Sequence, residues 1–397
     1  MMAKITRWIC YLLQIPLYLI SRFLPPRSHL WIFGAWQGLQ FADNSRHLYE
    51  YVRQHRPEIT PVWFTANRQV WQLLRSRGHR VVRINSIAAV WYAMRAQVAV
   101  VTHSLRTDLQ PVVHPAKTIT VQLWHGIPLK KIGYDDTRFT NPPRHGWQYG
   151  WEVFRNRLFP FWQEQYHVIA TTSQQLVPIF ASAFRHPQSA IQVTGYPRND
   201  RLFHPDSAPL VAAGERAVIY MPTFRGDMGS APDLFTPYSF NLSDLEKLLE
   251  AHNAHFFLRL HPVNHPPEHL RARISHSSRV HFLFTEDIHT ILAHFDVLIT
   301  DYSSIYFDFL LLNRPIIFAP FDHEQYTAID REFYFDYSQV TPGPHAHNWP
   351  EVVAALEAIF SGKDEYGSQR REICQQFHDF YDDQSAERVT RAIENCC

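Results

Sequence analysis

The sequence predicts an α/β protein made of two Rossmann-like domains that face each other across a cleft, followed by C-terminal helices. First, the 397 residues are enough for two domains that each bury a core. Second, short β-rich runs alternate with helical stretches in two consecutive series, which is the pattern of parallel sheets built from βαβ units. Third, several of these runs are apolar at consecutive positions, as expected of strands that are covered on both faces.

The composition excludes several classes of protein. Lys and Arg number 38 against 37 Asp and Glu, and 46% of the residues are hydrophobic, so neither long disorder nor bulk electrostatic binding of nucleic acid is expected. The 14 glycines form no G-x-G-x-x-G and no G-x-x-x-x-G-K-[ST], which excludes the standard dinucleotide fingerprint and the P-loop. The four cysteines include no C-x-x-C, so a disulfide framework and a zinc finger are not expected. The sequence contains no evident cluster of metal ligands, and it is compatible with a loosely bound Mg²⁺.

Residues 1–27 form the first predicted segment and raise the question of membrane attachment. The apolar run from Trp8 to Ile20 is interrupted by Gln14 and Pro16 and is flanked by basic residues. A spanning helix needs about 20 mostly apolar residues, so we favour a segment that lies in the interface of an anionic membrane. A helix packed on the body of the protein and a true membrane span are the alternatives.

The first domain is predicted over residues 28–203 and the second over 204–367, with terminal helices over 368–397. The strands expected in the first domain cover residues 29–33, 61–65, 80–84, 97–102, 118–124, 167–171 and 191–194. The strands expected in the second domain cover residues 217–221, 255–260, 280–284, 297–300 and 315–318. In open α/β sheets ligands bind outside the carboxyl ends of the strands, so functional residues are expected there.

His125 stands at one of these strand ends. It is followed by Gly126, which permits close approach of the backbone, and by Lys130 and Lys131, which supply positive charge. An imidazole is well matched to proton abstraction near neutral pH, so His125 is a candidate general base and the other three are candidate acceptor or phosphate contacts. The chain holds 24 histidines, so a purely structural role for His125 is the alternative.

His261 ends a predicted strand of the second domain, and Arg259 lies two residues earlier on the same face. We expect His261 to contact a phosphate or the leaving group. His265 and His269 follow at spacings of four, but the prolines around them break any helix, so a metal site is disfavoured.

Asp301, Ser303 and Ser304 follow the buried strand 297–300 and precede an apolar helical segment. Free N–H groups at a helix start bind anions without a glycine-rich loop, so we expect this turn to bind phosphate through the two serines. The alternative is that Asp301 or Ser303 only caps the helix.

Two further loops at strand ends carry arginines. Arg198 lies in the stretch 194–200, and Arg225 follows the strand 217–221 in the same loop as Thr223. A guanidinium group clamps phosphate through two hydrogen bonds, which makes these residues candidates for donor binding. Exposed loop arginines are common, so a role without a ligand is the alternative.

Together these segments resemble the CDP-glycerol glycerophosphotransferase family of teichoic-acid and related capsule synthesis, over about residues 30–390. The matching motifs are Trp124-His125-Gly126 with Lys130-Lys131, Gly195-Tyr196-Pro197-Arg198-Asn199-Asp200, Met221-Pro222-Thr223-Phe224-Arg225, Leu260-His261-Pro262 and Ile299-Thr300-Asp301-Tyr302-Ser303-Ser304. Weaker matches are Gly34 to Asn44, Tyr326, Arg331, Tyr334-Phe335-Asp336 and Pro342-Gly343-Pro344.

The resemblance implies a GT-B-like fold, a CDP-activated polyol donor and peripheral attachment to the cytoplasmic face of a membrane that carries the acceptor. It also implies that His125 and His261 are essential and that Ser303 and Ser304 contact the donor pyrophosphate. The long N-terminal extension of the family's polymerases is missing from this sequence, so a priming or short-chain transferase is as compatible with it as a processive enzyme.

We therefore expect a hydroxyl of a lipid-linked or polymer acceptor to attack the phosphorus nearest the polyol of CDP-glycerol or CDP-ribitol, glycerol preferred, releasing CMP. His125 would accept the hydroxyl proton, His261 and Arg225 would stabilise the developing charge, and Asp287 would contact the ribose. The alternatives are a nucleotide-sugar glycosyltransferase of cell-surface polysaccharide synthesis and a non-catalytic, membrane-bound scaffold that binds polymer.

Overall fold

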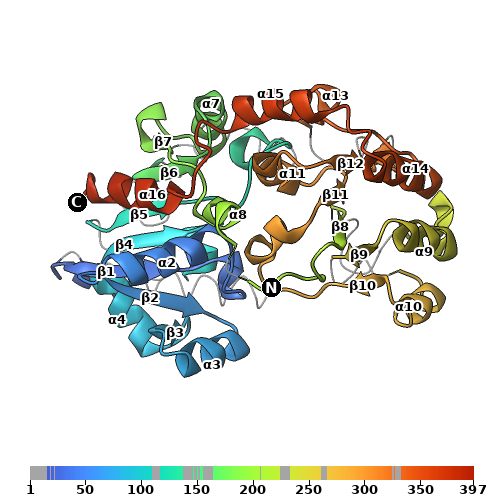
Figure 1. The fold of residues 1–397 in the computed structure, drawn as a ribbon. Coiled ribbons are helices and arrows are strands. Elements are labelled where there is room, and N and C mark those ends of the chain that lie inside the picture. The colour runs from blue at the N-terminus through green and yellow to red at the C-terminus, as the bar shows by residue number, and fades with distance from the viewer. Residues whose placement is uncertain are drawn as a thin grey trace. The chain divides into compact units, whose positions relative to one another are not determined.

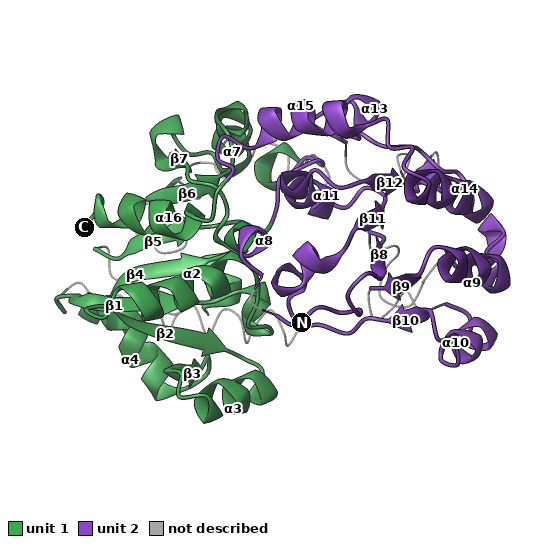
Figure 2. Ribbon diagram, in the orientation of Figure 1, with its two compact units in different colours: residues 1–125, 133–200, 382–397 green, residues 126–132, 201–381 purple. Residues whose placement is uncertain are grey.

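The computed structural model describes residues 16–17, 19–21, 23–109, 117–136, 146, 150, 153–154, 164–205, 207–223, 233–260, 266–323, 326 and 332–397 (Figure 1). The chain divides into two compact units. Unit 1 comprises residues 1–125, 133–200 and 382–397, and unit 2 comprises residues 126–132 and 201–381 (Figure 2). The sequence placed the change of domain at residues 203 and 204, whereas the structure places it at Asp200 and Arg201.

Unit 1 is built on a seven-stranded sheet in the order β3-β2-β1-β4-β5-β6-β7, in which every neighbouring pair is parallel. The strands are β1 (Arg27–Phe33), β2 (Thr60–Thr65), β3 (Val81–Arg83), β4 (Ala96–Val101), β5 (Ile119–Gln122), β6 (Val168–Thr171) and β7 (Ile191–Val193). The inner strands β5 and β6 are buried at every position, as expected of parallel strands that are covered on both faces. All seven strands expected from the sequence are confirmed, with ends that differ by one or two residues.

Two helices of unit 1, α3 and α4, begin at residues whose side chains cap them. The Asn67 side chain accepts the N–H groups of Gln69 and Val70, and the Ser86 hydroxyl accepts that of Ala89. The α-helices are α2 (Asp43–His55), α3 (Arg68–Ser76), α4 (Ile87–Arg95), α5 (Leu105–Asp108), α7 (Val177–Phe184) and α16 (Ser385–Glu394), and α8 (Asp200–Phe203) spans the junction with unit 2. The 3₁₀ turns are η1 (Trp36–Gly38), η2 (Gly133–Asp135), η4 (Gln174–Leu176), η5 (Gln188–Ala190) and η6 (Pro197–Asn199).

The last helix of the chain returns to unit 1. Val389 and Ile393 of α16 are fully buried in the core that also contains Trp31 of β1 and Trp63 of β2. This burial of apolar surface is the physical reason why α16 joins unit 1, although the sequence grouped all of residues 368–397 as one terminal element.

Unit 2 is built on a five-stranded parallel sheet in the order β10-β9-β8-β11-β12. The strands are β8 (Arg216–Met221), β9 (Ala254–Leu258), β10 (Val280–Phe282), β11 (Val297–Thr300) and β12 (Ile316–Phe318). All five expected strands are confirmed. The α-helices are α9 (Leu242–Ala251), α10 (Glu268–Ile274), α11 (Ile305–Phe309), α13 (Tyr337–Val340), α14 (Trp349–Phe360) and α15 (Gly367–Phe377). The 3₁₀ turns are η7 (Thr236–Tyr238), η8 (Ile288–Thr290), η9 (Leu292–His294) and η10 (Leu310–Leu312).

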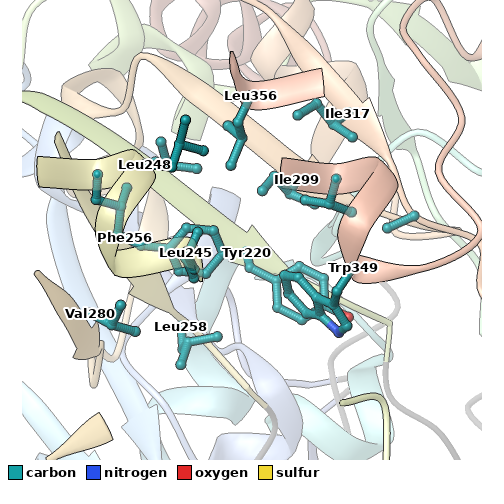
Figure 3. Close-up of a cluster of buried hydrophobic side chains, with 14 of the residues drawn as sticks. Tyr220, Leu245, Leu248, Phe256, Leu258, Val280, Ile299, Ile317, Trp349 and Leu356 are labelled. Atoms are coloured by element: carbon teal, nitrogen blue, oxygen red, sulfur yellow. The ribbon is translucent and has the colours of Figure 1, made fainter. Parts of the chain in front are cut away.

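The core of unit 2 gathers around Trp349, the first residue of α14 (Figure 3). Its ring meets Tyr220 of β8 edge-on with centroids 5.1 Å apart and stacks on Phe235 at 5.6 Å. Its indole N–H donates to the Leu234 carbonyl at 2.9 Å, so this buried polar group is satisfied.

Residues 126–132 belong to unit 2, although the sequence placed them within the first domain. The N–H of Lys131 donates to the Glu332 carbonyl at 2.8 Å, and the N–H of Tyr334 donates to the Leu129 carbonyl at 2.9 Å. These antiparallel contacts are the reason for the difference, because they join the segment to residues 332–334 of unit 2. The chain therefore passes from unit 1 to unit 2 directly after His125.

Of the predicted N-terminal segment, only residues 16–17, 19–21 and 23–27 are described, and the first two of these stretches are helical. The run that begins at Trp8 thus lies largely outside the described residues. Within the part of the chain that the structure describes, there is no helix with the length and apolar character required to cross a bilayer.

Candidate active site

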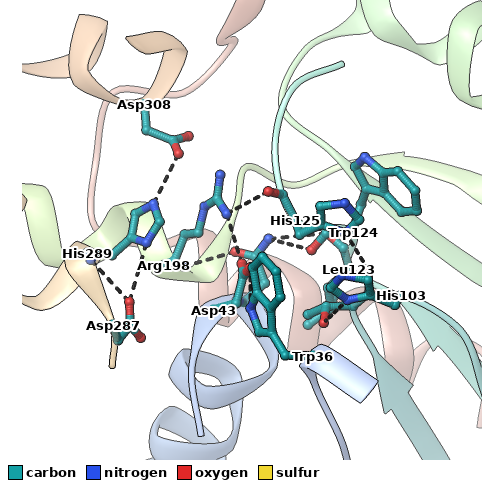
Figure 4. A network of polar contacts seen from close by, with 12 residues as sticks. Trp36, Asp43, His103, Leu123, Trp124, His125, Arg198, Asp287, His289 and Asp308 are labelled. Atoms are coloured by element: carbon teal, nitrogen blue, oxygen red, sulfur yellow. Dashed lines mark hydrogen bonds and ion pairs between the residues drawn. The ribbon is translucent and has the colours of Figure 1, made fainter. Parts of the chain in front are cut away.

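The turn that carries His125 is held in an unusual backbone conformation. Trp124 has φ 55° and Gly126 has φ 147°, which ends the extended run after β5. A bulky residue at positive φ is strained and persists only where its surroundings hold it. Here the Gln122 side-chain oxygen accepts the Trp124 N–H at 2.9 Å, and the Asn44 amide donates to the Leu123 carbonyl at 3.2 Å and to the Trp124 carbonyl at 3.0 Å (Figure 4).

The orientation of the His125 ring is defined by one hydrogen bond. Its Nδ1 lies 2.9 Å from the Thr102 carbonyl oxygen, which can only accept, so Nδ1 carries the proton. In the neutral ring Nε2 is therefore the basic nitrogen. The ring stacks on His103 with centroids 4.2 Å apart and an interplanar angle of 11°, and the Trp124 ring lies 4.0 Å away.

The surroundings of His125 keep its imidazole neutral. The pKa of His125 is lowered from 6.5 to about 3, mainly by burial and also by the neighbouring His103, while the Asp43 carboxylate acts in the opposite direction. A neutral imidazole at neutral pH is able to accept a proton. An anion bound close to the ring would raise its pKa and strengthen it as a base.

Arg198 supports the His125 turn from inside unit 1. Its side chain is 4% exposed and pairs with Asp43 at 2.9 Å, and the same Nη1 donates to the His125 carbonyl at 2.9 Å (Figure 4). The Arg198 N–H also donates to the Asn44 side chain at 3.2 Å. Through these contacts Arg198 positions the His125 turn, and its role in donor binding stays a prediction.

Several residues of this arrangement were missed as functional candidates by sequence reasoning. They are Trp36, Asp43, Asn44, Thr102 and His103. His103 and Thr102 follow β4, so the rule of strand ends could have found them. The others lie in the weaker family match from Gly34 to Asn44, but nothing in a single sequence shows that this stretch contacts a turn some 80 residues later.

In unit 2, Asp301 ties two strand ends together. Its Oδ1 accepts the Thr223 N–H at 2.8 Å, the Thr223 hydroxyl at 2.6 Å and the Tyr302 N–H at 2.6 Å. Asp301 is buried. The carboxylate therefore fixes the loop after β8 against the turn after β11, and the donor-site residues Asp301 and Thr223 serve at least to shape that edge.

Ser303 and Ser304 are half-buried and directly precede α11. Ser304 is the N-cap residue, but its side chain makes no capping hydrogen bond. Among the described residues, neither serine hydroxyl has a hydrogen-bond partner. The capping alternative therefore does not account for the hydroxyls, and both are available to an oxygen-rich ligand.

Arg259 and Asp287 lie on the same carboxyl edge of the unit 2 sheet. Arg259 directly follows β9, where burial lowers the pKa of its guanidinium group and Asp287 opposes that shift. The Asp287 side chain caps η8 by accepting the His289 N–H at 3.1 Å. Its carboxylate also lies 3.4 Å from His289 Nδ1, while Asp308 lies 3.1 Å from Nε2 (Figure 4). His289 and Asp308 were not foreseen, and they hold Asp287 within a buried network.

Both lysines of the 126–132 segment are engaged within unit 2. Lys130 is buried, its ammonium group donates to the Tyr326 hydroxyl, and its Nζ lies 4.6 Å from the centre of that ring. Tyr326 stacks on Tyr302 with centroids 4.1 Å apart. Lys131 pairs with Glu332. Two other predicted site residues, His261 and Arg225, lie outside the described residues.

Two Rossmann-like parallel α/β units, one with a neutral histidine at a strand end and the other with free hydroxyls and an arginine at strand ends, define a protein of the GT-B-like fold class. Solved structures share this fold. The wall teichoic acid polymerase TagF matches with a TM-score of 0.72 and 21% identity over 93% of this chain and 89% of its own. A putative UDP-N-acetylglucosamine 2-epimerase from Listeria monocytogenes matches with a TM-score of 0.55 and 12% identity over 93% and 96%.

The chain belongs to the CDP-glycerol:poly(glycerophosphate) glycerophosphotransferase family, whose model matches residues 16–395. The teichoic acid glycerol-phosphate transferase of Staphylococcus aureus is 28% identical over 93% of this chain and 93% of its own length. The teichoic acid ribitol-phosphate primase of Bacillus spizizenii is 25% identical over 95% and 94%. The poly(glycerol phosphate) polymerase of Bacillus subtilis is 29% identical over 87% of this chain, which spans 46% of that polymerase. The protein is thus an enzyme of the family that transfers polyol phosphates in teichoic acid synthesis.

Proposed function

We propose that the protein transfers glycerol phosphate from CDP-glycerol to a hydroxyl of a membrane-linked acceptor or a growing polymer and releases CMP. The observation that carries this proposal is the state of His125, whose Nδ1–H is held by Thr102 and whose neutral Nε2 can accept a proton. Glycerol is preferred over ribitol because the glycerol-phosphate transferase relative is 28% identical over nearly its whole length, against 25% for the ribitol-phosphate primase.

In the proposed reaction the acceptor oxygen forms a bond to the phosphorus nearest the polyol. The bond from that phosphorus to the bridging oxygen breaks, and the oxygen leaves with CMP. The acceptor proton passes to His125 Nε2. The negative charge of the donor favours the protonated ring, which compensates for the low pKa of His125 in the free protein.

Unit 2 is proposed to bind the donor. Among the described residues, the groups suited to pyrophosphate are the hydroxyls of Ser303 and Ser304 and the guanidinium group of Arg259. The serines follow β11 and Arg259 follows β9, the two strands that flank β8 in the sheet. Arg225 and His261 are proposed to stabilise the charge that develops on the transferred and leaving groups.

Peripheral attachment to the cytoplasmic face of the membrane, through residues 1–27, is part of the proposal. It is supported by the basic-flanked apolar sequence of that segment. An acceptor anchored in lipid is confined to a surface, so an enzyme held on the same surface meets it at a high effective concentration.

The test is an incubation of purified protein with CDP-glycerol, CDP-ribitol or UDP-sugars, each with candidate lipid acceptors, followed by mass spectrometry of both products. We expect CMP and an acceptor enlarged by one or more glycerol phosphate units. A glycosidic product with release of a nucleoside diphosphate would contradict the proposal in favour of sugar transfer. Absence of turnover with every donor, in protein that binds CDP-glycerol, would favour the scaffold.

A further inference from the structure

The His289 side chain lies between two carboxylates inside unit 2 (Figure 4). Its Nε2 is 3.1 Å from Oδ2 of Asp308, and its Nδ1 is 3.4 Å from Oδ1 of Asp287. Each of the three side chains is at most 7% exposed. Water and salt therefore screen the charges of this group only weakly.

This geometry determines the charge of the His289 ring. A carboxylate oxygen can only accept a hydrogen bond, and a neutral imidazole carries a proton on just one of its two nitrogens. In a neutral His289 the other nitrogen would turn a lone pair toward a carboxylate at 3.4 Å or less. A ring with a proton on both nitrogens is attracted by both carboxylates, so the arrangement favours the imidazolium ion.

The three residues belong to elements next to the candidate donor-binding groups. Asp308 is on α11, four residues after Ser304, which precedes that helix. Asp287 is the N-cap residue of η8, and His289 lies within η8. The Thr290 hydroxyl donates to the Asp287 carbonyl at 2.8 Å and the His289 N–H donates to the Asp287 carboxylate at 3.1 Å, so Asp287 is held firmly in its turn.

Asp287 also acts on Arg259. Burial lowers the pKa of the Arg259 guanidinium group, and the Asp287 carboxylate raises it. Arg259 directly follows β9, whereas the turn with Ser304 follows β11, and β8 lies between these two strands in the sheet. The charges therefore alternate from Asp308 through the His289 ring to Asp287, and on to the guanidinium group at the end of β9.

We propose that His289 is a positively charged positioning residue of the donor site. As an imidazolium ion it joins α11 to Asp287, and it offsets the negative charge that Asp287 would otherwise place beside Arg259. The guanidinium group is then available to a phosphate of the donor instead of being paired with Asp287. His289 acts through these two neighbours, and the proposal rests on the donor site assigned to unit 2 under the proposed function.

The charge of the ring is measured first, in the full-length protein with ¹⁵N-labelled histidine. NMR spectra that correlate the ring protons with both ring nitrogens are recorded at about pH 8, where a histidine with the ordinary pKa of about 6.5 is neutral. We expect a ring with protons on both nitrogens, and we expect its signals to be missing from His289→Gln. If that variant fails to fold, Asp308→Asn identifies the ring by shifting its signals.

Donor binding is measured second, by calorimetry with CDP-glycerol. His289→Gln removes the positive charge and should weaken binding by about tenfold, as expected when a charge-assisted contact to a phosphate is disturbed. The KM for CDP-glycerol should rise by a similar factor, while kcat changes by less than about threefold because His125 is untouched.

A double variant separates the charge from its effect on the fold. His289→Gln with Asp308→Asn removes one buried carboxylate together with the cation, so it should regain resistance to denaturant relative to His289→Gln alone. Its affinity for CDP-glycerol should stay low, because Asp287 still lacks its cation. If His289 only supported the fold, affinity would recover together with stability.

His269→Gln is the matched control, because His269 is an exposed histidine on α10 of the same unit. It should leave donor affinity unchanged. A His289 ring with one bare nitrogen, in a protein that binds CDP-glycerol, would overturn the role of His289 alone. Wild-type affinity in His289→Gln would overturn it as well. A wild-type protein that shows the charged ring but binds no CDP-glycerol would refute the donor site of the proposed function, and the positioning role with it.

Discussion

Replacement of His125 by Asn should remove a large acid sensitivity of the fold. The unfolded chain binds a proton at this histidine below about pH 6.5, whereas the folded protein holds its pKa at about 3. Stability is therefore lost as the pH falls from about 6.5 toward about 3. The shift corresponds to roughly 2 kcal/mol lost at about pH 5 and to roughly 4 kcal/mol at about pH 3.

The Asn side chain does not titrate, and its amide can still donate to the Thr102 carbonyl. Denaturant unfolding gives the free energy of unfolding at pH 7 and at about pH 5. The difference between these two values should be smaller in His125→Asn than in the wild type by roughly 2 kcal/mol. Turnover of the same variant should fall by roughly 10²-fold, while donor binding stays nearly unchanged, as expected for a lost general base.

His55→Asn is the matched control, because His55 is an exposed histidine of α2 in the same unit. It should change neither the pH dependence of stability nor turnover. Parallel stability curves for the wild type and His125→Asn would refute the claim that the fold holds this ring neutral. Turnover close to that of the wild type would refute its assignment as the base.

The remaining predictions concern the support of the His125 turn, the phosphate site and the membrane. Arg198→Met removes the cation that pairs with the buried carboxylate of Asp43 and should cost about 3–5 kcal/mol in chemical unfolding, with partial recovery when Asp43→Asn is added. A loss below about 1 kcal/mol would show that the ion pair is unimportant. Ser303→Ala with Ser304→Ala should weaken CDP-glycerol binding by about tenfold or more in calorimetry without abolishing it, because the backbone N–H groups remain, and unchanged affinity would place the pyrophosphate elsewhere. Deletion of residues 1–27 should move most of the protein from membranes to the soluble fraction. Activity of the shortened protein on a short soluble acceptor should survive. If the shortened protein is unfolded, the segment is a packed helix.

The strands were predictable because their signal is local. The inner parallel strands bury both faces and so read as short apolar runs, and all twelve runs identified in the sequence are strands in the structure. The positions of His125 and Ser303 at strand ends followed from the same runs.

Features that depend on contacts between distant segments were not predictable. Residues 126–132 join unit 2 through hydrogen bonds with residues 332–334, some 200 positions later. The helix α16 returns to unit 1 because its apolar face is buried there, and its own sequence is equally compatible with any apolar partner.

The role of Arg198 illustrates the same limit at the site. A loop arginine after a strand is compatible with a phosphate ligand, and the sequence does not reveal that Asp43, 155 positions earlier, pairs with it. The local chemistry of a residue type was predictable from the sequence, whereas its partner elsewhere in the chain was not.

The most direct test of the central claim follows the fate of the donor phosphorus nearest the glycerol. CDP-glycerol carrying a radioactive label only at that phosphorus is incubated with the wild type, with His125→Asn and with a purified acceptor. Transfer of glycerol phosphate predicts that the label enters the acceptor, that the CMP released is unlabelled, and that the variant incorporates roughly 10²-fold less. Label that leaves with the nucleotide as CDP would place the reaction at a carbon atom and would contradict the account.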